Sequence, residues 1–323
     1  MTTKEKKIAS ISLDLDNQWS YMKIHGDEGW DKYPSYLHIF IPHVLSILDE
    51  LDIKITFFIV AKDIESADNQ KYIKMITERG HEVGNHSYHH ESWLQTYSFE
   101  AIEKEITDAH NAIFSATGQE PKGFRGPGFS WSTDLLKVLE SKGYIYDAST
   151  LPTYLGPLAR LYYFSKSDLS KEEKKARKEL FGKFSEGLRS VKPYFWNLGN
   201  QKRLLEIPVT TMPIIKMPFH LSYLLYLSNI SMPLMNLYLS IALFLCRITG
   251  TPVSFLLHPL DIIGGDQVKE LAFFPGMNIN SDRKVLVFKK IIGKIAKQYK
   301  LVNMSLHAEA LLAGKTIVTK NIS

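Results

Sequence analysis

Cysteine is nearly absent from this chain of 323 residues, which contains only Cys246. A single cysteine excludes an intramolecular disulfide framework and a zinc site built from several thiolates. The N-terminus lacks the pattern of a secretory signal, because the charged start over residues 1–7 is not followed by an apolar stretch with a small-residue cleavage site. These absences predict a cytoplasmic protein, or one that lies peripherally on the cytosolic face of a membrane.

A strong charge of one sign is absent as well. The formal net charge is only +5, and we find no basic stripe interleaved with aromatic residues. We therefore expect no nucleic-acid partner. Apolar residues make up 45% of the chain and charged residues 23%, which is typical of a globular protein with a full core.

Residues 217–246 contain no Asp, Glu, Lys or Arg. Pro218 and Pro233 divide this stretch into apolar pieces over residues 221–230 and 234–246, each too short to span a bilayer. The pattern predicts two apolar helices, which either lie in a membrane interface or cover an active site. A plain core hairpin would give the same pattern.

Predicted strands and helices alternate along most of the chain, which indicates parallel βα units. The ranges predicted as strands are 8–15, 53–60, 81–85, 123–125, 143–146, 204–209 and 253–257, and those predicted as helices include 39–51, 70–79, 99–117 and 133–141. A TIM-like barrel is one such arrangement, and in such barrels the chemistry collects at the carboxyl ends of the strands.

Ionisable side chains fall at five of these predicted strand ends. They are Asp14 and Asp16 after the first strand, His86 to His90 after the third, then Arg125, Asp147 and His258. The domain prediction follows from this pattern. Residues 1–160 and 200–323 form the α/β barrel, 161–199 a basic helical insertion with its charge concentrated at 171–178, and 212–247 an apolar helical insertion.

His86 and His90 would lie on one face of a helical turn, so both imidazoles could bind one metal ion. His89 is an alternative to His90 at a spacing of three residues. Neutral imidazole suits zinc and other late first-row metals, and a catalytic zinc site takes three protein ligands. The third ligand must therefore come from elsewhere in the chain.

Asp14 and Asp16 are two residues apart on a strand, so their carboxylates point to the same face. Burying both is costly unless a cation or a shared proton compensates. One carboxylate on a metal would leave the other as a base. The alternative is a pair of acidic residues that cap a loop.

Five short motifs together resemble the polysaccharide deacetylase family, carbohydrate esterase family four. They are Asp14-x-Asp16, His86-Ser87-x-x-His90, Phe124-Arg125-x-Pro127-Gly128, Tyr146-Asp147 and Leu257-His258-Pro259. The resemblance covers most of the first half of the chain and a stretch around His258. It implies a distorted (β/α) barrel with seven strands and a metal-dependent hydrolysis of an amide.

The resemblance also implies roles for individual residues. Asp16, His86 and His90 resemble the metal ligands, with zinc as the favoured divalent metal. Asp14 resembles the general base, Arg125 the arginine that holds it, and His258 the general acid, which Asp261 could orient; Asp147 belongs to the fourth motif of the catalytic set. Two departures stand out. Leu15 separates aspartates that are adjacent in the family, so Asp14 and Asp16 could exchange roles, and Gly128 replaces an aromatic residue.

Residues 205–210 and 251–253 resemble the branch that deformylates aminoarabinose attached to a polyprenyl phosphate. The expected substrate is therefore an N-acyl amino sugar, acetylated or formylated, that is lipid-linked or a cell-envelope precursor, and a membrane surface is an expected partner. Two alternatives stay open: a hydrolase of small cyclic amides on the same fold, and a barrel that binds glycan or lipid without catalysis.

Overall fold

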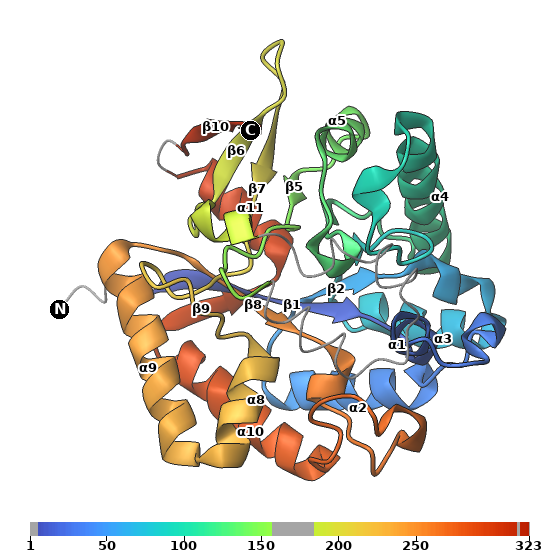
Figure 1. Ribbon diagram of the computed structural model, residues 1–323, viewed down its shortest axis with the longest axis vertical. Coiled ribbons are helices and arrows are strands. Elements are labelled where there is room, and N and C mark those ends of the chain that lie inside the picture. Colours follow the sequence, from blue (N-terminus) through green and yellow to red (C-terminus); the bar gives the residue numbers. More distant parts are fainter. Residues whose placement is uncertain (1–5, 157–183, 315–316, 323) are drawn as a thin grey trace.

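The computed structural model describes residues 6–156, 184–314 and 317–322. In chain order the strands and longer helices are β1 Lys7–Leu15, α1 Gln18–His25, α2 Leu37–Glu50, β2 Thr56–Ile59, α3 Ala67–Glu78, β3 Glu82–Asn85, α4 Phe99–Thr117, β4 Gly123–Phe124, α5 Thr133–Ser141, β5 Tyr146–Asp147, β6 Tyr194–Asn197, β7 Arg203–Glu206, α8 Leu221–Ile230, α9 Met232–Thr249, β8 Val253–Leu257, α10 Ser281–Ala296, β9 Tyr299–Val302, α11 Met304–Leu312 and β10 Thr319–Asn321. Figure 1 shows the helices arranged around the strands.

The strands form one sheet in the order β10-β6-β7-β5-β4-β3-β2-β1-β8. The seven strands from β7 to β8 in this order run parallel to their neighbours, and β6 joins β7 antiparallel. This is the mostly parallel α/β architecture that the alternating pattern predicted. The edges of the parallel run approach each other where Thr210 N, after β7, donates to Ser254 O of β8 at 3.0 Å.

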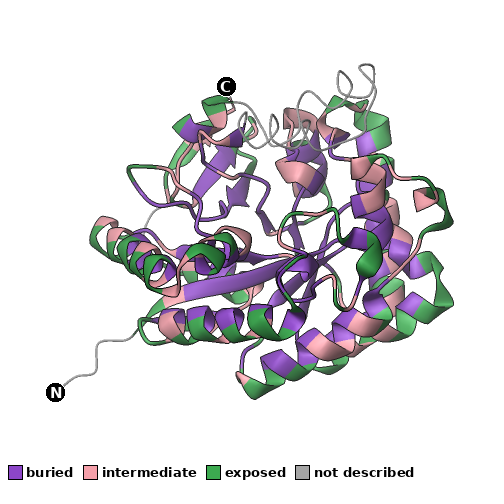
Figure 2. Ribbon diagram, turned by 60° about the horizontal axis from the view of Figure 1, so that its bottom comes forward, coloured by how far each residue is buried: buried purple, intermediate pink, exposed green. Residues whose placement is uncertain are grey.

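The central strand β1 is long enough to have three neighbours. Its first half pairs with β9, its second half with β2, and β8 pairs along most of its length. Seven consecutive residues of β1 are buried, and Figure 2 shows buried strands behind helices whose outer faces are exposed. All neighbours of β1 are parallel, so the carboxyl ends of β1, β2 and β8 lie at one edge of the sheet.

Local signals explain the elements whose bounds were predicted correctly. Ser98 and Ser132 cap α4 and α5 through side-chain oxygens, and Gly118 ends α4 in the left-handed conformation with φ +69°. The apolar sides of both helices then pack into the core. The resulting helices match the predicted ranges 99–117 and 133–141.

The predicted insertion over residues 161–199 is wrong at its C-terminal end. Strand β6, Tyr194–Asn197, lies inside that range and pairs with β7. Three aromatic residues in succession, Tyr194, Phe195 and Trp196, favour a strand there. The basic stretch at 171–178 lies outside the described residues.

The two predicted apolar helices are present as α8 and α9. The second is longer than predicted, since Ser231 caps it and Pro233 lies in its first turn, where a missing N–H costs nothing. With 18 residues, α9 is long and apolar enough to cross a membrane by length and composition alone. Its inner face is packed, because Met235, Leu239 and Leu243 are buried in the core.

Candidate metal centre and catalytic site

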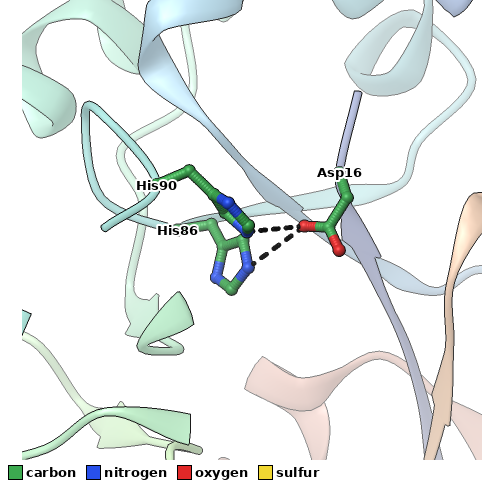
Figure 3. Close-up of side chains that lie close together, drawn as sticks. All are labelled: Asp16, His86 and His90. Carbon is green, nitrogen blue, oxygen red and sulfur yellow. Dashed lines mark ion pairs between the residues drawn. The ribbon is translucent and has the colours of Figure 1, made fainter. Parts of the chain in front are cut away.

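Asp16, His86 and His90 meet at the carboxyl ends of β1 and β3 (Figure 3). Asp16 Oδ1 lies 2.9 Å from His90 Nε2 and 3.5 Å from His86 Nε2. One ligand atom from each residue falls within 4.8 Å of the others, which is compatible with binding a single ion. All three side chains are largely buried.

The backbone after β3 positions the two histidines. His86 N continues the sheet by donating to Ile59 O at 2.9 Å, and the turn that follows has φ of +65° at Ser87 and +55° at His90. The prediction of a helical turn over 86–90 is therefore wrong. Two left-handed residues and a hydrogen bond from His90 N to Ser87 Oγ bring the imidazoles together instead.

His86 is held in the tautomer that a metal ligand requires. Its Nδ1 lies 2.6 Å from the carbonyl oxygen of Arg125, which can only accept, so Nδ1 carries the proton. The unprotonated Nε2 then points toward Asp16. Fixing one ring nitrogen by a carbonyl is the usual support for a metal-binding histidine.

His89, the alternative ligand, points elsewhere. Its Nδ1 pairs with Glu105 Oε2 at 2.8 Å, and its side chain is 52% exposed. The same carboxylate of Glu105 accepts from the backbone N–H groups of Tyr88 and His89 and so anchors the turn. The structure thus brings His90, not His89, to Asp16.

The donor set fits a divalent metal ion. Asp16 Oδ1 and His90 Nδ1 are buried without a hydrogen-bond partner in the described chain, although Asp16 is close to both imidazoles. Burial disfavours the charge of Asp16, yet the neighbouring histidines lower its pKa below the ordinary value. One carboxylate and two imidazoles are the mixed oxygen and nitrogen ligands of many catalytic zinc sites.

Asp14 and Arg125 form a buried ion pair beside this group. Arg125 Nη1 donates to Asp14 Oδ1 at 2.6 Å and to Ser12 Oγ at 3.0 Å, while its Nε donates to Ala148 O at 3.1 Å. The guanidinium is fully buried and lies 4.4 Å from the centre of the Phe58 ring. These contacts fix the orientation of the Asp14 carboxylate.

His258 directly follows β8, which pairs with β1. Its Nδ1 lies 3.7 Å from Asp261 Oδ2, and the same oxygen accepts from His258 N at 2.9 Å. Burial opposes a charge on His258, but Asp261, Asp14 and Asp16 together raise its pKa to about 9. At neutral pH the residue is therefore a cation able to donate a proton.

Asp147, another predicted site residue, lies in a buried network of polar side chains. Its Oδ1 accepts from Ser149 Oγ at 2.5 Å, and it interacts with Glu206, which accepts from Thr150. Burial raises the pKa of both carboxyl groups, which favours a shared proton. A catalytic role for Asp147 stays a prediction, since its contacts are with this network.

Sequence reasoning missed the polar residues that support Asp16. The Tyr36 hydroxyl donates to the carbonyl oxygen of Asp16. Asn17 follows Asp16 directly. The side chains of Asn17 and Trp19 each donate a hydrogen bond to Asp63 Oδ1 at 2.7 Å. Burial raises the pKa of Asp63 to about 7. The one available signal was Asn17, which follows the motif directly and caps α1.

Comparison with known proteins relates part of the chain to one family. Residues 27–146 match the family model described as polysaccharide deacetylase. This part of the chain is therefore similar to the polysaccharide deacetylase family. The matched segment contains His86, His90 and Arg125, whereas Asp14, Asp16 and His258 lie outside it.

Several similar curated proteins are named as deacetylases or deacetylase-like proteins, and each matches over part of its length. A peptidoglycan deacetylase-like protein of Gibberella zeae is 30% identical over 49% of this chain and 46% of its own length. A peptidoglycan-N-acetylglucosamine deacetylase of Bacillus cereus is 28% identical over 42% of this chain and 58% of its own. The chain thus spans about half the length of these relatives.

Two solved structures share the fold across nearly the whole chain. A protein described as a polysaccharide deacetylase from Mycobacterium smegmatis superposes with a TM-score of 0.62 and 19% identity, covering 100% of this chain and 96% of its own. The Puue allantoinase has a TM-score of 0.57 and 14% identity, covering 96% and 91%. The likeness therefore extends the shared fold beyond the segment that matches in sequence.

Proposed function

We propose that the protein is a metal-dependent hydrolase that removes an acetyl or formyl group from the nitrogen of an amino sugar. The observation that carries the proposal is the buried group of Asp16, His86 and His90 beside the Asp14–Arg125 pair. The deacetylase activities named for the relatives support amino-sugar amides as the substrate class. The donor set favours Zn²⁺.

Asp16, His86 and His90 would hold the metal through one carboxylate oxygen and the two Nε2 atoms. A bound divalent metal polarises a carbonyl and lowers the pKa of water. Asp14 would then accept a proton from the attacking water. The hydrogen bond from Arg125 Nη1 to Asp14 Oδ1 supports this role, because it orients the carboxylate.

The leaving amine also needs a proton, because expulsion of an amide anion is prohibitive at neutral pH. His258 supplies it, since Asp261 and the site aspartates keep the imidazole charged. The amide C–N bond breaks, water oxygen stays on the acyl carbon, and the amine leaves with the proton of His258. The products are a carboxylic acid and a free amino sugar.

We further propose that the substrate is lipid-linked and that the protein works as a peripheral protein on a membrane surface. Apolar side chains recur every three or four residues along one side of α9 and are between 42% and 59% exposed. These residues, the α9 stripe, are Leu234, Leu237, Ile241, Phe244 and Ile248. Because the opposite face is packed in the core, α9 would lie in the interface and not span the bilayer.

Cationic side chains border the α9 stripe. Lys294 of α10 donates to Asn236 O and Ser240 Oγ of α9, at 2.7 and 2.6 Å. Lys7 donates to Arg247 O at 3.4 Å, and Lys6 to the end of α10. An apolar stripe with a basic border suits an anionic lipid surface.

The activity test offers the purified protein N-acetyl and N-formyl amino sugars, free and polyprenyl-phosphate-linked, together with cyclic ureides. We expect a free amine from an amino sugar, with turnover that depends on added divalent metal. Asp14→Ala and His258→Ala should each lose about 10²- to 10⁴-fold in rate. Parental activity in both variants would contradict the mechanism, and turnover of ureides alone would favour a cyclic amidase.

The membrane proposal has its own test. Flotation with liposomes that contain anionic lipid should carry the protein upward, and binding should weaken as salt is raised. Failure to bind liposomes of any composition would refute the membrane proposal and leave the proposed reaction intact.

A further inference from the structure

His220 joins the apolar helices to the site. It directly precedes α8, and its ring lies 6.2 Å from the ring of His258, at 65°. An isolated backbone pairing between Thr211 and Pro218 closes the loop before it. On its other side, Tyr223 packs edge-on against the His220 ring at 4.8 Å. The ring contacts with His258 and Tyr223 fix the position of the His220 imidazole.

One ring nitrogen of His220 is left without a partner among the described residues. The side chain is 7% exposed, and its Nδ1 is buried without a hydrogen-bond partner. A buried polar group left unsatisfied is destabilising, so such an atom in a binding site points to a ligand that satisfies it. His220 does not cap α8 through its side chain, which removes the usual structural reason for a polar residue there.

The electrostatic surroundings place His220 on the proton-donor side of the site. Burial lowers the pKa of His220 to about 4, with the nearby His258 as the next cause, while Asp261 and Asp14 act in the opposite direction. The imidazole is therefore neutral at pH 7, with one nitrogen that donates and one that accepts. A neutral group beside a charged His258 suits contact with hydroxyl and amine groups of a sugar.

We propose that His220 is a further substrate-binding residue, whose neutral imidazole hydrogen-bonds the amino sugar on the side where the amine leaves. The inference rests on the proposed function and adds a specificity residue supplied by the apolar helical segment. Through His220, the segment that carries the α9 stripe contributes directly to sugar recognition. A lipid-linked sugar would then contact one continuous part of the chain with both its sugar and its lipid.

The test replaces His220 by a residue of similar volume without polar atoms. His220→Phe keeps the ring packing against Tyr223 and His258 and should lower kcat/KM for the best amino-sugar substrate about 10- to 100-fold, mainly through KM. His220→Asn and His220→Gln place an amide near Nδ1 and near Nε2, and at least one should recover part of the loss. Metal content and thermal midpoint should stay at the parental values.

His43→Phe is the matched control, because His43 lies on α2 and also has an unpartnered ring nitrogen. It should leave kcat and KM unchanged. Parental kinetics in His220→Phe, or a loss that neither amide variant relieves, would overturn the inference while the proposed function stands. A parent protein that hydrolyses no amino-sugar amide would remove the basis of both.

Discussion

Residues 7–147 and residues 184–322 build the site in different ways. The first region consists of successive parallel strands and helices from β1 to β5, and its strand ends carry the Asp16, His86 and His90 group. The second region adds an antiparallel strand, two apolar helices and β8, which returns to pair with β1. The first region thus holds the candidate metal ligands, and the second brings His258 near Asp16 and carries the exposed apolar side of α9.

The difference indicates a division between chemistry and recognition. The family match lies within residues 27–146, whereas α8 and α9 fall outside it. Substitutions at the site residues of the first region should therefore abolish the reaction with any substrate. Substitutions on α9 should instead change where the protein acts and on which form of the sugar.

The largest effect is expected from the candidate metal ligands of the first region. Asp16→Ala or His86→Ala should lose bound metal and lower turnover on the order of a thousandfold, because several kcal/mol of transition-state stabilisation depend on the ion. Metal content by mass spectrometry and amine release are the measurements. His89→Ala is the control, since His89 pairs with Glu105 and points away from Asp16. Equal metal loss in His89→Ala would show that the ligand assignment is wrong.

The next effect concerns the buried pair that links β1 and β4. Arg125→Met leaves Asp14 buried without its cation, so we expect a loss of about 3–5 kcal/mol in the free energy of unfolding. Urea denaturation followed by circular dichroism measures it. Arg79→Met breaks an exposed pair with Asp49 and should have no measurable effect. Adding Asp14→Asn to Arg125→Met should restore part of the stability, and failure to do so would argue against the electrostatic cause.

The accuracy of prediction from sequence also differs between the two regions. Helices α4 and α5 have serine caps and clear apolar periodicity, so their bounds were predictable. The candidate metal ligands were proposed from sequence because they lie just after predicted strands, and the structure brings Asp16, His86 and His90 together at the ends of β1 and β3. The turn from His86 to His90 was not, because positive φ at Ser87 and His90 is stabilised by contacts with Glu105 and Arg125 that are distant in sequence.

In the second region, tertiary contacts determine more of the structure. The residues of β6 were predicted to belong to a helical insertion. This four-residue strand is stabilised by its antiparallel pairing with β7, and that pairing cannot be read from the local sequence. The approach of His220 to His258 depends on how α8 packs near β8, and no spacing in the sequence encodes it. Local sequence patterns therefore pointed to the candidate metal ligands. They gave no indication of His220, which is proposed to bind the substrate.

The α9 stripe of the second region, proposed to contact a membrane, gives an intermediate effect. Leu237→Glu combined with Phe244→Glu places two charges on the α9 stripe, and liposome partitioning should fall about tenfold or more, since burial of each apolar side chain is worth roughly 1.5–3 kcal/mol. Hydrolysis of a soluble amino sugar should be unchanged. Phe114→Glu, on the exposed side of α4, is the control and should bind liposomes like the parent.

The smallest effect is a displacement of the pH profile. The pKa of His258 is raised to about 9, so the proton donor is charged below that pH and kcat/KM should fall as pH rises through about 9. Since the folded-state pKa lies above the ordinary 6.5, the pair with Asp261 also contributes stability that is complete below pH 6.5 and is lost as pH rises through about 9. Asp261→Asn removes the largest raising influence, and we expect the alkaline limb to move about one pH unit toward neutrality.

The alkaline limb separates the two regions, because Asp261 and His258 both follow β8, whereas the candidate metal ligands follow β1 and β3. Asp261→Asn should therefore retain full metal content while its pH profile shifts. Lys202→Met, which breaks an exposed pair with Glu140, should leave the profile in place. An alkaline limb that does not move in Asp261→Asn would assign it to a group other than His258, and the proton donor would then have to be sought in the first region.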